Sequence, residues 1–134
     1  SCPRRLNVRN FQRRRRIEAS ELARECAAAA ADRKAADILI IDLRGLSSYT
    51  DYFVICSVAS EPQLKAVAGS VQDALRERCG LKPKAVDGLP ASQWVVVDYT
   101  DVIVHIFHHD LRLRYALEDL WNDAPVEEFV ETSE

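Results

Sequence analysis

The sequence has no hydrophobic run approaching the roughly 20 residues that a membrane-crossing helix needs. Its first residues are rich in arginine and lack the basic region followed by an apolar stretch that is typical of a secretory signal. We therefore expect a soluble, non-secreted protein that works in the cytoplasm and does not bind a membrane.

Cysteine and glycine are both scarce, with four residues of each. The cysteines form no Cys-x-x-Cys pair and no spacing suited to a zinc site with the three histidines, so we expect reduced thiols. The glycines form neither a phosphate-binding loop nor a Gly-x-Ser-x-Gly nucleophile elbow. We expect no cofactor, no resident metal and no catalytic residue.

Charge is distributed unevenly, although the formal net charge is only −3. The start of the chain is basic, and its densest run is Arg13, Arg14, Arg15 and Arg16, whereas the last residues carry only acids. A basic arm gains affinity for phosphate backbones by releasing counterions, so this run is a candidate for weak RNA contact. With nearly half of its residues apolar, the chain predicts one domain over 20–124, a flexible basic arm over 1–19 and an acidic tail over 125–134.

Three segments predict helices. The first covers about residues 20–35 and has Ser20 as its expected N-cap. The second begins at Ser60, where Gln63 completes a capping box, and ends at Gly80. The third follows Asp110 and ends near residue 122, because leucines recur there at helical spacing.

Short runs rich in β-branched residues predict strands at 36–43, 52–57, 83–86, 94–97 and 102–107. Connections too short for a helical crossover predict antiparallel hairpins for 36–43 with 52–57 and for 94–97 with 102–107. The order of elements predicts an α/β fold with a mixed sheet of about five strands flanked by three helices.

A cluster of ionisable residues lies inside the hydrophobic stretch QWVVVDYTDVIVHIFHH and comprises Asp98, Asp101 and His105, followed by His108, His109 and Asp110. One interpretation is a metal site or general base of a small metal-dependent hydrolase or nucleotide-handling enzyme that uses the first three. The other is that the aspartates form a turn and His105 is a half-buried strand residue. The strand period of two favours the second, since it separates Asp98 from the face shared by Asp101 and His105.

Three large aromatic residues occupy positions where side chains often stay partly exposed. Trp94 opens a strand, Tyr99 lies in a turn and Trp121 ends a helix. Exposed tryptophan and tyrosine are enriched at protein interfaces, but they also close the edges of cores. Periodicity leaves both interpretations open.

In order and spacing, the segments LRGLSSYTDYFVICSVAS, QLKAVAGSVQDAL, WVVVDYTDVIVHIF and LRLRYALEDLWNDA resemble the ribosomal silencing factor family, RsfS, also called Iojap-like. The resemblance covers about residues 20–124. It implies a mixed-sheet fold similar to that of nucleotidyltransferases, without their catalytic motif or activity. It also implies a protein that binds the universal large-subunit ribosomal protein fourteen, blocks joining of the small subunit and represses translation when nutrients are limiting.

The resemblance also implies which residues meet the ribosomal protein. The interface candidates are Trp94, Val95, Val97, Asp98, Tyr99, Asp101 and His105, and a second motif adds Thr50, Asp51 and Tyr52 with lower rank. Relatives are often seen as homodimers, so self-association is a further expectation. Many relatives have glycine where this chain has Thr100, a residue that resists a positive φ.

Overall fold

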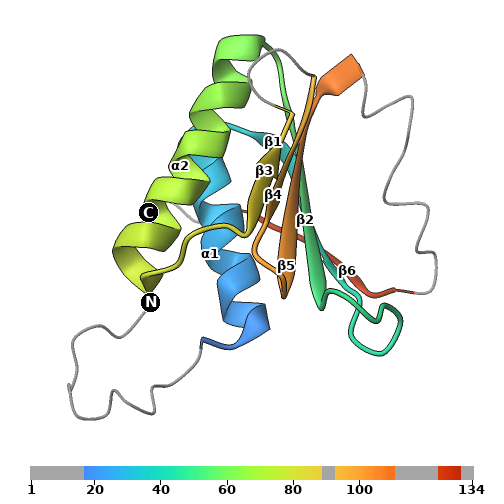
Figure 1. The fold of residues 1–134 in the computed structure, drawn as a ribbon. Helices are drawn as coiled ribbons and strands as arrows, with labels where there is room; N and C mark the ends of the chain where they lie inside the picture. Colours follow the sequence, from blue (N-terminus) through green and yellow to red (C-terminus); the bar gives the residue numbers. More distant parts are fainter. Residues whose placement is uncertain (1–16, 89–92, 111–123, 131–134) are drawn as a thin grey trace.

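The computed structural model describes residues 17–88, 93–110 and 124–130. Within them, a six-stranded mixed sheet carries two helices on one face (Figure 1). The elements are α1 (Ala19–Asp32), β1 (Ala36–Asp42), β2 (Tyr52–Val58), α2 (Glu61–Cys79), β3 (Ala85–Asp87), β4 (Trp94–Asp98), β5 (Val102–His108) and β6 (Val126–Glu128). The predicted α/β class is confirmed, with one strand more than expected, whereas the predicted third helix falls mostly outside the described residues.

Helix α1 is rich in alanine and presents a shallow apolar face to the sheet. Leu22, Cys26 and Ala30 are buried along this face. The prediction of Ser20 as the N-cap is wrong, because the helix begins at Ala19 and its N-cap is Glu18, whose side chain makes no capping bond. Good helix formers extend the helix past the residue with the best capping chemistry.

Helix α2 begins and ends as its sequence predicts. Ser60 Oγ accepts a hydrogen bond from the Gln63 backbone N–H at 3.2 Å, and Gly80 ends the helix in the left-handed conformation with φ of 68°. The Gln63 side chain differs from a standard capping box, since its Oε1 accepts from Ala59 N at 2.7 Å. Its Nε2 donates to Arg33 O and Lys34 O at the end of α1, both at 3.0 Å. Gln63 thus joins the end of α1 to the start of α2.

The strands lie in the order β3-β4-β5-β2-β1-β6. The two predicted hairpins are confirmed, because β1 pairs with β2 and β4 pairs with β5 in antiparallel register. The centre of the sheet is the parallel pair β2 and β5, which runs from Tyr52 opposite Val102 to Val58 opposite His108. The intervening chain contains α2, which provides the long crossover that parallel strands require.

Strand β6 corrects the expectation that the chain beyond residue 125 is only a tail. Val126–Glu128 pairs with β1 in antiparallel register and forms an edge of the sheet. The Phe129 backbone N–H donates to Ile38 O at 2.8 Å, and the Phe129 side chain packs on the core. Glu127 accepts a hydrogen bond from Arg24 of α1 at 2.7 Å. The acidic composition hid this strand because its three residues are all exposed.

Apolar side chains pack on both faces of the sheet. On the helix side they include Val54, Val95, Val97, Val104 and Ile106, all fully buried. A smaller cluster occupies the opposite face and comprises Ile41, Leu43, Ile55, Phe107 and Ala124, with Phe53 and Trp94 packed against it. Of the helices in the described ranges, none combines the length and apolar character needed to span a membrane.

Gly88 lies where the chain passes close to β4, and its φ is 106°. A Cβ at this position would lie 2.3 Å from Trp94 O and 3.0 Å from Val95 Cα. We therefore expect Gly88→Ala to lower the free energy of unfolding by roughly 2 kcal/mol or more. Urea denaturation followed by circular dichroism measures the change.

Gly69 provides the matched control, because it lies in α2 and a Cβ there meets no atom within 4 Å. Gly69→Ala should leave stability unchanged or raise it by up to about 1 kcal/mol through helix propensity. Equal effects of the two substitutions would contradict the close approach at Gly88.

Candidate functional site on the outer face of the sheet

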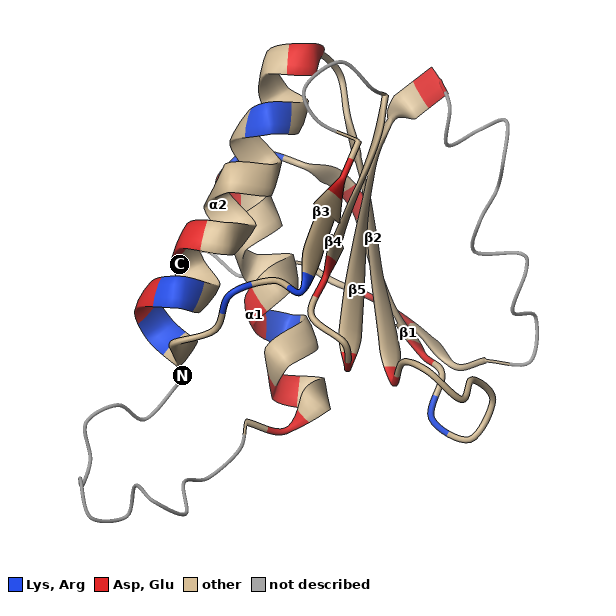
Figure 2. Ribbon diagram, in the orientation of Figure 1, with Lys and Arg blue, Asp and Glu red and all other residues tan. Residues whose placement is uncertain are grey.

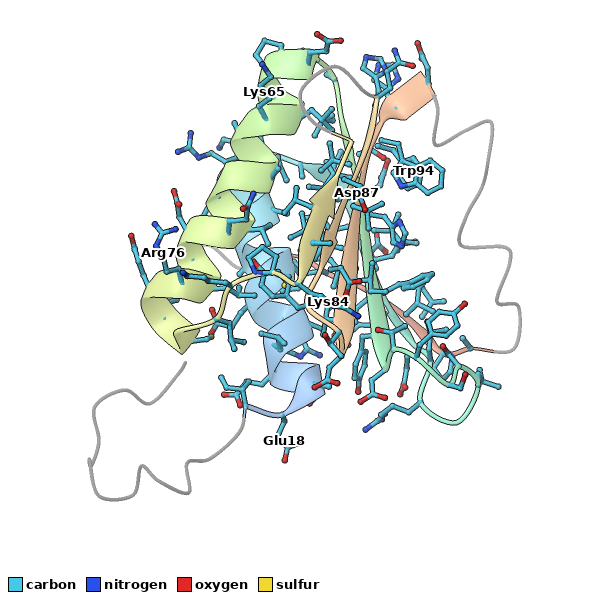
Figure 3. All side chains as sticks on the ribbon, in the orientation of Figure 1. Glu18, Lys65, Arg76, Lys84, Asp87 and Trp94 are labelled. Carbon is cyan, nitrogen blue, oxygen red and sulfur yellow. The ribbon has the colours of Figure 1, made fainter. Side chains whose placement is uncertain are left out.

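Two of the predicted interface residues, Trp94 and Asp98, are partly exposed on the sheet face away from the helices, here called the outer face, and the buried His105 belongs to the same face. Strand register places Trp94 beside Phe107, Val96 beside His105 and Asp98 beside Ile103. The parallel pairing adds Phe53 beside Ile103. Figure 3 shows Trp94 projecting from the side of the sheet opposite the helices. Five of these residues are partly exposed and form what we call the outer-face strip: Phe53, Trp94, Val96, Asp98 and Ile103.

Trp94 is held in place by the residues beneath it. Its indole Nε1–H donates to His105 Nδ1 at 3.2 Å, and its ring stacks on Phe107 with 5.0 Å between centroids. The His105 ring meets Phe53 edge-on at 4.6 Å. Aromatic pairs in these geometries add stability beyond their buried area, so the strip has a rigid foundation.

His105 is neutral in this environment. Because Nδ1 accepts the indole hydrogen bond, the ring proton is on Nε2, and Nε2 is buried with no hydrogen-bond partner within the described part of the chain. Burial lowers the pKa of His105 to about 4. The side chain therefore acts as an uncharged acceptor that orients Trp94. His105 is a strand residue, as expected, but at 7% exposure it is buried and not half-buried.

Asp98 stabilises the turn between β4 and β5. Its Oδ1 accepts the Thr100 backbone N–H at 2.7 Å. The Tyr99 N–H donates to Val102 O at 2.8 Å, and the Asp101 N–H donates to Tyr99 O at 2.9 Å. Thr100 adopts φ of 75°, so the turn keeps a left-handed residue although threonine resists that conformation.

The second-rank motif lies directly beside this turn. Asp101 O accepts the backbone N–H groups of Asp51, at 2.9 Å, and Tyr52, at 3.1 Å. Thr50 is buried, and its hydroxyl donates to Tyr52 O at 3.4 Å. The two motifs, about fifty residues apart in the chain, therefore lie together at one end of the sheet. Thr50 and Tyr52 are part of the buried structure there, while the carboxylates of Asp51 and Asp101 stay accessible.

Three predicted interface residues are not on the outer face. Val95 and Val97 are 0% exposed and Tyr99 is 8% exposed, all within the helix-side core. Burial raises the pKa of the Tyr99 hydroxyl, which has no hydrogen-bond partner in the described ranges. These side chains cannot touch a docked partner in this structure, because strand alternation turns them away from Trp94.

Sequence reasoning left three members of the strip out of the site: Phe53, Val96 and Ile103. The period of two was a usable signal for Val96, which shares a face with Trp94 and Asp98. Phe53 and Ile103 required the register between strands, which places them opposite each other in the parallel pair. Only the pairing of β2 with β5 adds them to the surface.

Within the described ranges, Asp98, Asp101 and His105 do not have the spacing of metal ligands. The group that has this spacing is His108, His109 and Asp110. The candidate arginines Arg13, Arg14, Arg15 and Arg16, together with Trp121, lie outside the described residues. Among the described residues, we find no hydrogen bond or ion pair that joins the side chains of Asp98, Asp101 and His105, as a catalytic group would require.

The fold and site define an α/β domain whose outer face presents a rigid aromatic strip bordered by carboxylates. The family described as "Ribosomal silencing factor during starvation" matches residues 16–134. The ribosomal silencing factor RsfS of Bacillus subtilis is 45% identical over 100 residues, which cover 75% of this chain and 84% of that protein. A solved Chromobacterium violaceum structure superposes with a TM-score of 0.76 at 31% identity and covers 87% of this chain and 97% of that one.

The chain belongs to the ribosomal silencing factor family. A mouse relative, named "Mitochondrial assembly of ribosomal large subunit protein 1", is 33% identical over 89 residues, 65% of this chain and 39% of that protein. The family match continues through the acidic segment 125–134, which we expected to lie outside the family pattern. Strand β6 explains this extension, since that segment contributes to the sheet.

The depressed pKa of His105 predicts a pH-dependent stability. The unfolded chain binds a proton on this residue below about pH 6.5, whereas the folded chain does so only near pH 4. The stability that depends on a neutral His105 is therefore fully present above pH 6.5 and is lost as the pH falls. The free energy of unfolding decreases by about 3 kcal/mol by pH 4. Denaturant titrations from pH 7 to pH 4 should show that His105→Phe removes this part of the decrease.

The exposed His109 supplies the control for the substitution itself, because His109→Phe makes the same replacement and leaves the buried His105 in place. Identical pH profiles for wild type and His105→Phe would show that His105 is not a buried neutral imidazole.

The left-handed Thr100 predicts a stabilising substitution. Thr100→Gly should raise the free energy of unfolding by roughly 1 kcal/mol, because glycine adopts the observed φ of 75° without a Cβ clash. Thr100→Ala keeps the Cβ and should give less of this gain. Thermal denaturation of the two variants distinguishes relief of backbone strain from loss of the threonine side chain. An equal change in stability for Thr100→Gly and Thr100→Ala would exclude relief of backbone strain.

Proposed function

We propose that the protein is a non-enzymatic ribosomal silencing factor that binds the large ribosomal subunit through its universal protein fourteen. Binding there sterically blocks joining of the small subunit and represses translation in the cytoplasm under nutrient limitation. Family membership supports the silencing role, and the name of the mouse relative associates that protein with the large subunit.

The outer-face strip is the proposed docking surface, and it is the observation that carries the proposal. Phe53, Trp94, Val96 and Ile103 present partly exposed apolar area on rigid strands. Tryptophan anchors of this kind dominate binding energies when they enter a pocket of the partner. Because His105 and Phe107 fix the Trp94 ring in the free protein, little side-chain entropy is lost on docking.

The border of the strip is acidic at the turn end. Asp98 and Asp51 are partly exposed and Asp101 is exposed. Helix α2, which lies away from the outer face, carries three basic residues, Lys65, Arg76 and Arg78 (Figure 2). A basic protein surface would complement this border, and complementary charge accelerates association and selects the partner.

Silencing by this route requires no chemical step. A protein that occupies a surface needed by the small subunit excludes it in proportion to concentration and affinity. His105, which the enzyme interpretation used as a base, serves here as the support of Trp94. His105 therefore affects docking only through the orientation of the indole.

Substitution of Trp94 tests the docking surface. Trp94→Ala should weaken binding to isolated large subunits by roughly tenfold or more, because it removes the central anchor. Co-sedimentation at several protein concentrations measures the affinity, and subunit joining in the same mixtures measures the silencing effect. Circular dichroism and thermal denaturation establish that the variant is folded.

Val126→Ala supplies a matched control, because Val126 is an apolar side chain, 49% exposed, on the edge strand β6. It should bind and silence as the wild type does. If folded Trp94→Ala bound large subunits with unchanged affinity, the outer-face strip would not be the docking surface. If wild-type protein bound but did not reduce subunit joining, the steric mechanism would be wrong.

A further inference from the structure

A second cluster of polar side chains lies where β5 ends, and the proposed docking surface does not use it. His108 is the last residue of β5, opposite Val58, and its backbone N–H donates to Gln93 O at 2.8 Å. His109 and Asp110 follow directly. The cluster is therefore anchored at one residue by the sheet and continues into two exposed residues.

The three side chains converge on a small volume. One ligand atom from each of His108, His109 and Asp110 lies within 4.8 Å of the other two. His109 Nδ1 is 3.1 Å from one carboxylate oxygen of Asp110, and His108 Nδ1 is 3.9 Å from the other. The imidazole rings stack with 4.6 Å between centroids, and each places its Nδ1 near a different oxygen of the same carboxylate.

These separations are close to what a metal ion needs. Ligand atoms of a tetrahedral zinc site lie about 3.3 Å apart, given zinc-to-nitrogen and zinc-to-oxygen bonds near 2 Å. Movements of about 1 Å would bring the set to that spacing, and such movements are small for exposed side chains. The side chains of His109 and Asp110 are 54% and 70% exposed, whereas His108 is 18% exposed and fixes the position of the site.

The hydrogen bonding of His108 also suits a cation. Its Nδ1 accepts the Asp110 backbone N–H at 3.3 Å, so this ring nitrogen offers its lone pair on the side of Asp110. That hydrogen bond is long, and a metal ion could replace it without disturbing β5. The lone pair and the carboxylate oxygen 3.9 Å away provide two donors that a cation can bridge.

We propose that His108, His109 and Asp110 bind a divalent transition-metal ion of the zinc class at the end of β5. Two imidazoles and one carboxylate form a donor set that zinc prefers, whereas magnesium and calcium prefer oxygen ligands alone. Three protein ligands leave a coordination position for water or for a donor from another molecule. This inference departs from our expectation of no metal and is independent of the proposed ribosomal role.

Isothermal titration of the full chain with Zn²⁺ alone tests the site. Cys2→Ser and Cys79→Ser in all proteins remove two thiols that could bind the ion elsewhere. One ion should bind per chain, and His109→Ala or Asp110→Asn should each weaken binding by roughly tenfold or more. Mg²⁺ at the same concentration should give no binding.

Asp98→Asn and His105→Gln are the matched controls, since they remove a carboxylate and a histidine outside the cluster. Both should retain wild-type zinc affinity. Absence of zinc binding, or binding that His109→Ala and Asp110→Asn leave unchanged, would overturn the proposal. Equal binding of Mg²⁺ would overturn the assigned class of metal, and none of these results depends on ribosome binding.

Discussion

The parallel pairing of β2 with β5 is the interaction on which the rest of the structure depends. It joins two hairpins that are separated in sequence by α2, and it places the hydrophobic strands of each at the centre of one sheet. It also brings the Thr50–Tyr52 segment against the turn at Asp101. Parallel strands need a long crossover, and α2 lies in the chain between these two strands. The outer-face strip depends on the same pairing, because Phe53 joins it through β2.

The outer-face strip is supported by His105, a buried residue that uses only part of its hydrogen-bonding capacity. His105 accepts from Trp94 through Nδ1 and leaves Nε2 unpartnered within the described residues. An unsatisfied buried donor costs free energy, which the surrounding aromatic contacts offset. A phenylalanine there would avoid this cost but could not orient the indole. The histidine is thus explained by the position of Trp94.

The sequence predicted most local structure, since strand alternation, short hairpin connections and the Ser60 cap are local properties. Prediction from the sequence failed where contacts between residues distant in the chain determine the structure. Val95, Val97 and Tyr99 were expected at an interface because the family resemblance implied it, yet strand alternation turns them toward the two helices, where they are buried. Phe53 joins the strip only through register, and β6 forms because β1 offers an edge to three exposed residues. The silencing role was implied by the family resemblance and by no local pattern.

Strand β6 also imposes an order on folding during synthesis. Its partner β1 is made early, and Ile40 lies opposite Glu127, which the ribosome adds 87 residues later. Until then, one edge of β1 has open backbone donors and acceptors, while β2 already occupies the other. An open edge invites pairing with another nascent chain. A polypeptide released before Val126 would therefore keep this edge of β1 unpaired and prone to aggregation.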